Sequence, residues 1–499
     1  MLARLGLASY VGAAHFSGDE NPGASINELS GLMLMTSPRP AIEFPGEPQA
    51  NAVRAALTAQ EPISLRTYTP SQVVIARSAG VFHWTSDGRR LYDFTSGVLV
   101  SNLGHNPRRW MQRFAGYMGW SENTLFGTPA AANEYVPAVP LTAYNAMTEI
   151  EGLAVQRLLR NMRGCVGGSR MESVMWSASG AEAVQKALWA CLGRDETRPL
   201  MVATRFGFHG KKGLAGAVTG SETDKDRDPR VKFISFPREE VDDLSKLAEP
   251  LDLTLYRREL EALWAAHGRQ LNCLITEPYL GGGGSFHPHP EYLQLLQDWC
   301  RQHDIVFILD EVQSNFGRTG TMYAFEKYGL EPDIVCLGKG LGNGVAVSAA
   351  VGLADLLASL KYGEGSDTWS ANPLASAAVV ATLDEFESED VLGHAAKLHR
   401  IFVEGLQVLK RTCVVKHLRG EGMVFGLECA AFGGRTPQET AIEFVRTCYL
   451  GRPDGDGIHF LGPLAGKVLR VSPPMTMTET EAHASLTLLQ ELVSGLAAR

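Results

Sequence analysis

Short apolar runs and amphipathic stretches alternate along the chain between about residues 150 and 360. The runs have the length of strands and lie at residues 274–276, 306–309, 334–337 and 346–352. Between them, stretches such as 181–192 and 292–303 carry apolar residues at the spacing typical of helices. This alternation predicts an α/β domain in which helices cover a mostly parallel sheet.

The flanking regions show other patterns. Residues 1–65 mix Gly, Pro, Ala and Ser with short apolar pieces, which predicts an arm that packs on the chain's own surface or on a partner subunit. Residues 73–94 alternate around a turn at Asp87-Gly88, as the strands of a meander do. Past about residue 385, amphipathic helices and short strands indicate an α+β domain. The predicted divisions are an arm at 1–65, the first part of a small domain with a linker at 66–140, a large domain at 141–384 and the C-terminal small domain at 385–499.

Composition narrows the class of protein. The 499 residues are 45% hydrophobic and 20% charged, as in a folded protein with a sizeable core. The net charge of −9 and the lack of a Lys/Arg block argue against a nucleic-acid partner. No stretch approaches a membrane span, and glycines interrupt the first fourteen residues, unlike a signal peptide. The 8 scattered cysteines lack a CxxC pair, which predicts reduced thiols in a cytoplasmic protein.

Two residues at neighbouring strand ends suggest the chemistry. Asp310 ends the apolar run 305–309, and Lys339 follows the run 334–337 within a glycine-rich turn. Ligands of open α/β sheets bind in the crevice at the carboxyl ends of the strands. A lysine that forms a Schiff base and a carboxylate that keeps a pyridine nitrogen protonated are the minimum for pyridoxal phosphate (PLP) chemistry. Each residue alone is more often a cap or a loop residue, and only the combination points to this cofactor.

The sequence around both residues resembles that of a known family. Residues 309–313 and 316–320, followed by 332–335 and 338–340, resemble the pattern of class III aminotransferases, which are PLP enzymes of fold type I. The resemblance extends from about residue 68 to the C-terminus. It implies a seven-stranded, mostly parallel sheet and a small domain built from both N- and C-terminal segments.

The resemblance also implies the residues that hold the cofactor. Ser179, Gly180 and Ala181 resemble the phosphate-binding turn at a helix start. The family usually has Ser or Thr where this chain has Ala181, so one hydroxyl contact is missing. Phe208 and His209 match an aromatic-His-Gly element whose ring stacks on the pyridine face.

Three further positions follow from the same comparison. Gln313 aligns with a residue that contacts the 3-hydroxyl of the cofactor, and Glu277 with a polar residue that lines the site. Thr368 matches a threonine that in relatives reaches the phosphate of the neighbouring subunit's cofactor. We therefore expect a homodimer with sites completed across a two-fold axis, and the sequence leaves open whether dimers pair into tetramers.

The implied reaction is transamination. An amine donor displaces Lys339 from the cofactor, and the freed lysine moves a proton from the substrate's Cα. A positive environment should lower the pKa of this lysine so that its amine is neutral. A 2-oxo acid then runs the steps backward and leaves as an amino acid.

Two departures from the family's pattern concern the substrate. Lys211 stands where acetylornithine and ornithine transaminases have a carboxylate-clamping arginine, and lysine offers a point charge instead of a planar fork. Residues 281–284 are all glycine, whereas many relatives have a glutamate at position 282 that pairs with an arginine corresponding to Arg470. We therefore expect Arg470 to bind the acceptor's carboxylate. The expected donor is an ω-amine, a diamine or an ω-amino acid, with pyruvate or 2-oxoglutarate as acceptor.

Alternatives remain open at this point. An aminomutase acting on an amino aldehyde uses the same lysine and aspartate but needs no separate acceptor. An inactive, PLP-binding regulatory protein is disfavoured because Lys339, Asp310, Gln313 and Thr368 are all present. We expect no metal, since the pair His287 and His289 has no third ligand at suitable spacing.

Overall fold

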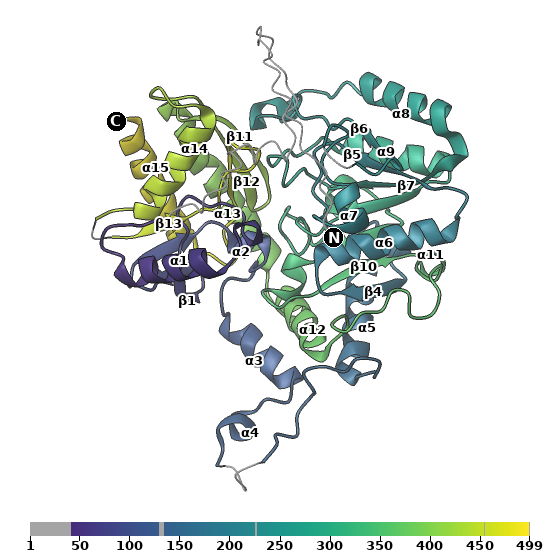
Figure 1. Ribbon diagram of the computed structural model, residues 1–499, viewed down its shortest axis with the longest axis horizontal. Coiled ribbons are helices and arrows are strands. Elements are labelled where there is room, and N and C mark those ends of the chain that lie inside the picture. Colours follow the sequence, from purple (N-terminus) through teal and green to yellow (C-terminus); the bar gives the residue numbers. More distant parts are fainter. Residues whose placement is uncertain (1–40, 129–133, 225–226, 454, 499) are drawn as a thin grey trace, which may run out of the picture.

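A seven-stranded sheet forms the centre of the larger part of the molecule (Figure 1). The computed structural model describes residues 41–128, 134–224, 227–453 and 455–498. The strands in sheet order are β4 (Ser173–Ser177), β10 (Ser348–Gly352), β9 (Ile334–Leu337), β8 (Val306–Asp310), β7 (Leu271–Thr276), β5 (Leu200–Thr204) and β6 (Val231–Ile234). Only β10 runs opposite to its neighbours in this sheet. The prediction of a seven-stranded, mostly parallel sheet is confirmed.

Helices cover both faces of this sheet (Figure 1). Side chains alternate along each strand: Cys273 and Ile275 of β7 pack in a cluster with α6, and Leu274 packs in a second cluster with α9. The helices of this large domain are α5 (Glu149–Arg163), α6 (Gly180–Arg194), α7 (Gly213–Ala217), α8 (Thr254–His267), α9 (Pro290–Gln302), α10 (Ala324–Tyr328), α11 (Ala354–Leu357) and α12 (Pro373–Ser388). Both faces of the strands are therefore buried, which explains their nearly continuous apolar runs.

The small domain combines two sheets. One has the order β1 (Ile75–Ala79), β2 (Phe82–Thr85), β3 (Arg90–Asp93) and β13 (Gly457–His459), and the other has the order β11 (Val415–Glu421), β12 (Val424–Cys429) and β14 (Val468–Val471). The helices packed near them are α1 (Pro48–Gln60), α13 (Val391–Gln407), α14 (Pro437–Leu450) and α15 (Glu479–Ala497). Since β13 pairs in parallel with β3, both ends of the chain build this domain, as predicted.

Shorter helices and turns complete the described structure. Helices α3 (Arg108–Tyr117) and α4 (Glu122–Phe126) extend from the body at the bottom of Figure 1. The 3₁₀ turns are η2 (Ile63–Leu65), η3 (Gly168–Arg170), η4 (Leu244–Ala248), η5 (Gly268–Gln270), η6 (Lys339–Gly342) and η7 (Val408–Thr412). No helix in the described ranges is both long and apolar enough to cross a membrane. The predicted domain boundaries at residues 65, 140 and 384 stay a prediction.

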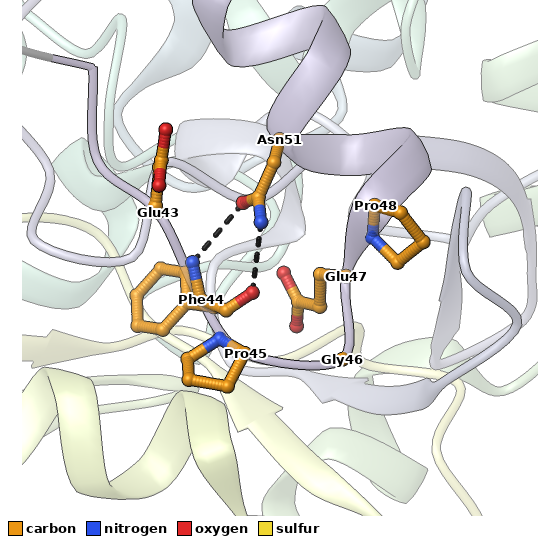
Figure 2. Close-up of a pocket in the computed structure, with 7 residues that line it drawn as sticks. All are labelled: Glu43, Phe44, Pro45, Gly46, Glu47, Pro48 and Asn51. Atoms are coloured by element: carbon orange, nitrogen blue, oxygen red, sulfur yellow. Dashed lines mark hydrogen bonds between the residues drawn. The ribbon is translucent and has the colours of Figure 1, made fainter.

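The described part of the N-terminal arm is fixed to the small domain. Residues 1–40 of the predicted arm lie outside the described residues. Glu47, just before α1, accepts hydrogen bonds from Arg54, Arg89 and Tyr449 at 2.7–2.8 Å. Figure 2 shows the adjoining turn, in which the side chain of Asn51 donates to the carbonyl of Phe44 (2.8 Å) and accepts from its amide (3.0 Å). Glu47 and Asn51 thus hold the turn together, and the hollow that they line is part of this anchor.

Candidate active site

Three ionisable side chains meet at the carboxyl edge of the large sheet. Asp310 is the last residue of β8, Glu277 follows β7, and Lys339 follows β9 with one residue between. The strands are paired so that Thr276 lies opposite Leu309 and Asp310 opposite Cys336. Parallel strands end at the same edge, so this register brings the three side chains together.

The backbone around Lys339 is tightly confined. Lys339 has a left-handed φ of 47°, which is uncommon for a residue with a side chain. A β-carbon at Gly338 would lie 2.8 Å from Ser348 Oγ, and one at Gly340 would lie 2.5 Å from Asn102 Nδ2. The flanking glycines are therefore required by the close approach of neighbouring side chains, and they fix where the lysine projects.

The surroundings of Lys339 favour a neutral amine. Burial and the positive charge of Arg470 lower its pKa from 10.5 to about 8, although Asp310 and Glu277 act in the opposite direction. A lysine whose pKa lies close to neutrality can act as a nucleophile and as a base. The sequence analysis predicted a lowered pKa for Lys339 and attributed it to positive charge around the cofactor. In the structure, part of the lowering comes from the positive charge of Arg470.

Asp310 is held by His209. Its Oδ2 lies 2.7 Å from His209 Nδ1, and its Oδ1 accepts a hydrogen bond from the amide of Val312 at 3.0 Å. Both side chains are buried. A histidine that hydrogen-bonds a carboxylate fixes its orientation, so His209 positions Asp310.

Glu277 links the aromatic-His-Gly element to the strand edge. Its two oxygens accept hydrogen bonds from the amides of Phe208 (2.9 Å) and Gly281 (3.2 Å) and from the side chain of Gln313 (2.8 Å). Burial raises the pKa of Glu277 to about 7, with the nearby charge of His209 acting against this shift. Glu277 thus orders the loops that surround Lys339.

Gln313 continues this network to Arg470 on β14. The Nη1 of Arg470 donates a hydrogen bond to Gln313 Oε1 at 2.6 Å. Its Nε is buried and has no hydrogen-bond partner, and within the described parts of the chain the guanidinium forms no ion pair. Arg470 therefore brings a positive charge to the site without a direct carboxylate contact in the described residues, and burial lowers its pKa, against the nearby charge of Glu277.

The glycines at 281–284 pack against aromatic residues. A β-carbon at Gly282 would lie 2.8 Å from the Cβ of Phe208, and one at Gly283 would lie 2.9 Å from the carbonyl oxygen of Phe206. Gly284 has a φ of 124°, which residues with side chains rarely adopt. The loop consequently has no room for a larger residue at position 282 without movement of Phe208.

The start of α6 offers free backbone donors. Ser179 caps the helix by accepting a hydrogen bond from the amide of Glu182 at 3.4 Å, and the carboxylate of Glu182 caps the amides of Ala178 and Ser179 in return. Within the described structure the amides of Gly180 and Ala181 have no acceptor. Two free amides at a helix start suit an anionic group.

Arg318 is a structural residue that sequence reasoning did not single out. Its buried guanidinium donates to the carbonyls of Met423 and Pro473, both at 2.8 Å, and to Asn102 Oδ1 at 2.5 Å. It also contacts the hydroxyl of Ser96, in a left-handed turn, α2 (Ser96–Leu99). Arg318 thereby joins the two domains beside the site. The only sequence signal for it was its place in the motif at 316–320.

Two of the predicted site residues lie apart from this group. Thr368 is exposed on the loop before α12, next to Asp367, which Lys186 holds by an ion pair at 2.7 Å. Lys211 is exposed beside α7. The structure brings together Lys339, Asp310, Gln313, Glu277 and Arg470 with the hydrogen-bonded Phe208 and His209, and it leaves Thr368 and Lys211 on the surface of the chain.

Comparisons with known proteins agree with this architecture. Residues 127–493 match the family model "Aminotransferase class-III". The chain is 28% identical over 447 residues to the acetylornithine aminotransferase of Caldanaerobacter subterraneus subsp. tengcongensis, covering 88% of this chain and 99% of that protein. It is also 28% identical over 481 residues to the 4-aminobutyrate aminotransferase of Mycobacterium tuberculosis, covering 93% and 99%. A PLP-bound amine transaminase from an uncultivated Pseudomonas species has 26% identity and a TM-score of 0.70, covering 88% and 97% of the two chains.

The chain belongs to the class III aminotransferase family. Members of this family are PLP-dependent enzymes that transfer an amino group from an amine donor to a 2-oxo acid. The residues present fit that cofactor: a lysine amine with a lowered pKa, a histidine-held carboxylate and two helix-start amides without an acceptor in the described residues occupy one edge of one sheet. The expected class and cofactor are therefore confirmed.

Proposed function

We propose that this protein transfers an amino group from an ω-amine, a diamine or an ω-amino acid to a 2-oxo acid such as pyruvate or 2-oxoglutarate. The observation that carries the proposal is the state of Arg470, a buried guanidinium bound to an amide oxygen and not to a carboxylate. An arginine with free N–H groups binds a planar carboxylate through two parallel hydrogen bonds. The acceptor supplies such a carboxylate.

The packing of the 281–284 loop supports the same conclusion. Where Gly282 stands, a glutamate that neutralised Arg470 would clash with Phe208, since even a β-carbon lies 2.8 Å away. The loop therefore supplies no carboxylate partner for Arg470 in either half-reaction. A donor whose amine lies on a carbon without a carboxylate does not need a second arginine to bind an α-carboxylate. At the position where relatives have that arginine, the exposed Lys211 offers only a solvated charge.

The roles of the other residues follow from their positions. When bound, PLP supplies an electron sink for the pair left at the substrate's Cα. Lys339 takes the proton from that Cα and returns it to the acceptor carbon in the second half-reaction. Asp310, oriented by His209, would hold the ring nitrogen in its protonated form.

The remaining candidate residues bind the edges of the cofactor. The amides of Gly180 and Ala181, with Ser179, would hold the phosphate at the start of α6. Phe208 would pack on the ring and Gln313 would bind its hydroxyl, while Glu277 keeps Gln313 in place. A phosphate here gains from the helix dipole although the hydroxyl at position 181 is absent.

The names of the relatives are compatible with the proposed donors. They include a 4-aminobutyrate aminotransferase, an acetylornithine aminotransferase and an amine transaminase. All three names describe amine donors that differ from a simple α-amino acid, which supports the ω-amine assignment for this chain.

We further propose that the active form is a homodimer. Large apolar side chains lie exposed on the segments 122–128 and 134–147 and on the loop before α12, among them Phe126 (82% exposed), Met147 (96%) and Trp369 (62%). Clusters of this kind mark surfaces that a partner covers. Thr368 lies next to Trp369, so a second copy that covered this surface would receive Thr368 close to its own site. Size-exclusion chromatography with light scattering tests the assembly.

A cytoplasmic location is the last part of the proposal. Of the 8 cysteines, Cys191, Cys273, Cys300, Cys336, Cys429 and Cys448 are buried and unpaired. Buried free thiols behave as small apolar side chains and suit a reducing compartment.

The function is tested by titrating the purified, cofactor-loaded protein. The panel contains putrescine, β-alanine, 4-aminobutyrate, taurine, ornithine and glutamate, and the readout is conversion of the cofactor's absorption band to that of the pyridoxamine form. We expect ω-amines to convert the band faster than glutamate does. The fastest conversion by glutamate would refute the donor class. Turnover of an amino aldehyde without added 2-oxo acid would instead favour the aminomutase.

A further inference from the structure

A second group of chemically competent side chains lies on the four-stranded sheet of the small domain. His83 on β2 pairs with Leu91 of β3, and His459 on β13 pairs with Asp93 of β3. Residues two apart on a strand face the same side, so Leu91 and Asp93 share a face. The register therefore places His83, Asp93 and His459 side by side on one face of three adjacent strands.

These three residues have the geometry of a ligand set. One ligand atom from each lies within 4.8 Å of the other two, and His83 Nε2 lies 3.5 Å from Asp93 Oδ2. All three side chains are buried. The Nδ1 of His459 is buried without a hydrogen-bond partner. A buried polar atom without a partner is unfavourable, and a cation that accepts its lone pair removes this cost.

Neighbouring groups orient these side chains. Ser78 Oγ lies 2.7 Å from His83 Nδ1, which leaves Nε2 of that ring directed at Asp93. Asp93 Oδ1 accepts hydrogen bonds from the amide and the hydroxyl of Thr95, both at 2.7 Å. His105 Nε2 lies 2.7 Å from Asp93 Oδ2. Hydrogen bonds to the far side of ligand groups are typical of metal sites, where they fix tautomers and ring orientations.

We propose that His83, Asp93 and His459 bind one divalent transition-metal ion that cross-links the two chain ends within the small domain. Two imidazoles and one carboxylate are a donor set suited to zinc. Zinc lies ~2.0–2.1 Å from such ligands in a tetrahedron, so the three atoms draw in to about 3.4 Å from one another on binding. A water completes the coordination, and His105 keeps its hydrogen bond to Asp93 Oδ2.

This site is separate from the transamination machinery. The groups that set the pKa of Lys339 are Arg470, Asp310 and Glu277, and none of them belongs to the histidine cluster. The role of the ion is structural, since β2 and β3 come from the N-terminal segment and β13 from the C-terminal one. The sequence predicted no metal because it considered only His287 and His289, which are close in the chain. The proposed ligands are brought together only by strand pairing.

The wild-type holoenzyme gives the primary test. The protein is freed of adventitious ions with a chelator, returned to one equivalent of zinc, and crystallised. We expect an anomalous difference peak at the zinc absorption edge between His83, Asp93 and His459. We also expect about one zinc per protomer by elemental analysis. No peak at this cluster, or a peak only elsewhere, overturns the proposal.

Variants test the ligands one at a time. Zinc at about 100 times its Kd should raise the Tm of the wild type by about 3 °C. His83→Gln and His459→Gln should each abolish that rise, whereas His483→Gln, on the exposed side of α15, should keep it. Ser78→Ala should weaken zinc binding by about 10-fold while all ligands remain. A rise that persists in both ligand variants overturns the proposal. If these variants do not fold, the diffraction measurement on the wild type decides.

Discussion

Two buried aspartates in this molecule have similar local surroundings. Asp310 ends β8 in the large domain, and Asp93 ends β3 in the small domain. The Oδ2 of each lies 2.7 Å from a histidine nitrogen, that of His209 in one case and that of His105 in the other. Each of the second oxygens accepts backbone hydrogen bonds, from Val312 and from Thr95.

The two pairs differ in what else faces the carboxylate. The charge of Asp310 acts on the pKa of Lys339. Asp310 also lies at the carboxyl edge of the sheet, where ligands bind, so an organic cation or a protonated ring can approach it. Asp93 faces two further imidazoles, those of His83 and His459. Burial raises the pKa of Asp93, but hydrogen bonds from His105 and His83 outweigh this and hold it well below the ordinary range. A buried His–Asp pair therefore does not by itself determine what a site binds. The further side chains that face the aspartate determine it: Lys339 in the large domain, and His83 and His459 in the small domain.

Removal of the lysine beside one aspartate should give the largest effect. Lys339→Ala should lower kcat by more than about 10⁴-fold, because one side chain both anchors the cofactor and moves the proton. Single-turnover measurements with an ω-amine donor provide the readout. The matched control is Lys397→Ala, an exposed lysine on α13, which should keep full activity. Activity in Lys339→Ala comparable to that of the control would show that the assignment of the lysine is wrong.

Exchange of the two aspartates should separate their roles. Asp310→Asn should lower kcat by about 10²–10³-fold, since the ring nitrogen loses its counter-charge, with little change in Tm. Asp93→Asn should leave kcat within about fivefold but lower Tm by about 3–5 °C, because His105 and His83 lose a buried anionic partner. Kinetics and differential scanning calorimetry on both variants check this.

The reverse outcome would break the comparison. If Asp93→Asn lost activity at a temperature where the protein stays folded, both aspartates would serve the reaction. If Asp310→Asn unfolded the protein, the pair with His209 would be structural. Either result would remove the distinction between the two domains.

Replacement of Arg470, which is hydrogen-bonded to Gln313, should give the next largest effect. Arg470→Ala should raise KM for the 2-oxo acid by about 10–100-fold, because a charge-assisted hydrogen bond pair is lost, and should leave KM for the amine donor within threefold. Arg470→Lys should restore only part of the affinity, since a lysine lacks the planar fork. An equal rise for donor and acceptor would refute the assignment of Arg470 to the acceptor.

The placement of Asp310 and Lys339 at one edge of the large sheet could be predicted because both residues lie in local motifs. Asp310 and Lys339 each directly follow an apolar strand, so their placement required only the rule that parallel strands end at one edge. The helix start at Ser179 was likewise visible as a capping pattern. The alternating faces of β7 and its neighbours explain why the sheet could be predicted from apolar runs.

Other features depended on long-range packing and could not be predicted. The contact between Gly282 and Phe208 follows from how one loop rests on another, and the pairing of Arg470 with Gln313 joins residues from different domains. The histidine cluster requires the register of β3 with β13. Single histidines at positions 83 and 459 have no local pattern that distinguishes them from core residues.

A pH profile sharpens the description of the lysine environment. The cofactor-free enzyme should regain PLP at a rate that rises about tenfold per pH unit up to about pH 8 and then levels off, since only the neutral amine of Lys339 attacks an aldehyde. A lowered lysine pKa moves this inflection down from 10.5. In Arg470→Ala a positive neighbour is removed, so the inflection should move to higher pH. Stopped-flow absorbance measures both curves, and an inflection that stays in place would mean that Arg470 does not act on Lys339.

Lys211 should give the smallest effect. It is exposed and lies apart from the buried network, and the interaction of a solvated cation with a carboxylate is weak. Lys211→Ala should therefore change KM for any donor by less than about fivefold, and added salt should reduce the difference further. Lys211→Arg tests whether a planar guanidinium at this position binds a carboxylate. This variant should improve binding of donors with an α-carboxylate, such as ornithine, more than that of putrescine. If Lys211→Ala instead raised KM by 100-fold, a partner subunit or a closing loop must bury this lysine beside the substrate, and the contrast between buried and exposed cations at this site would no longer hold.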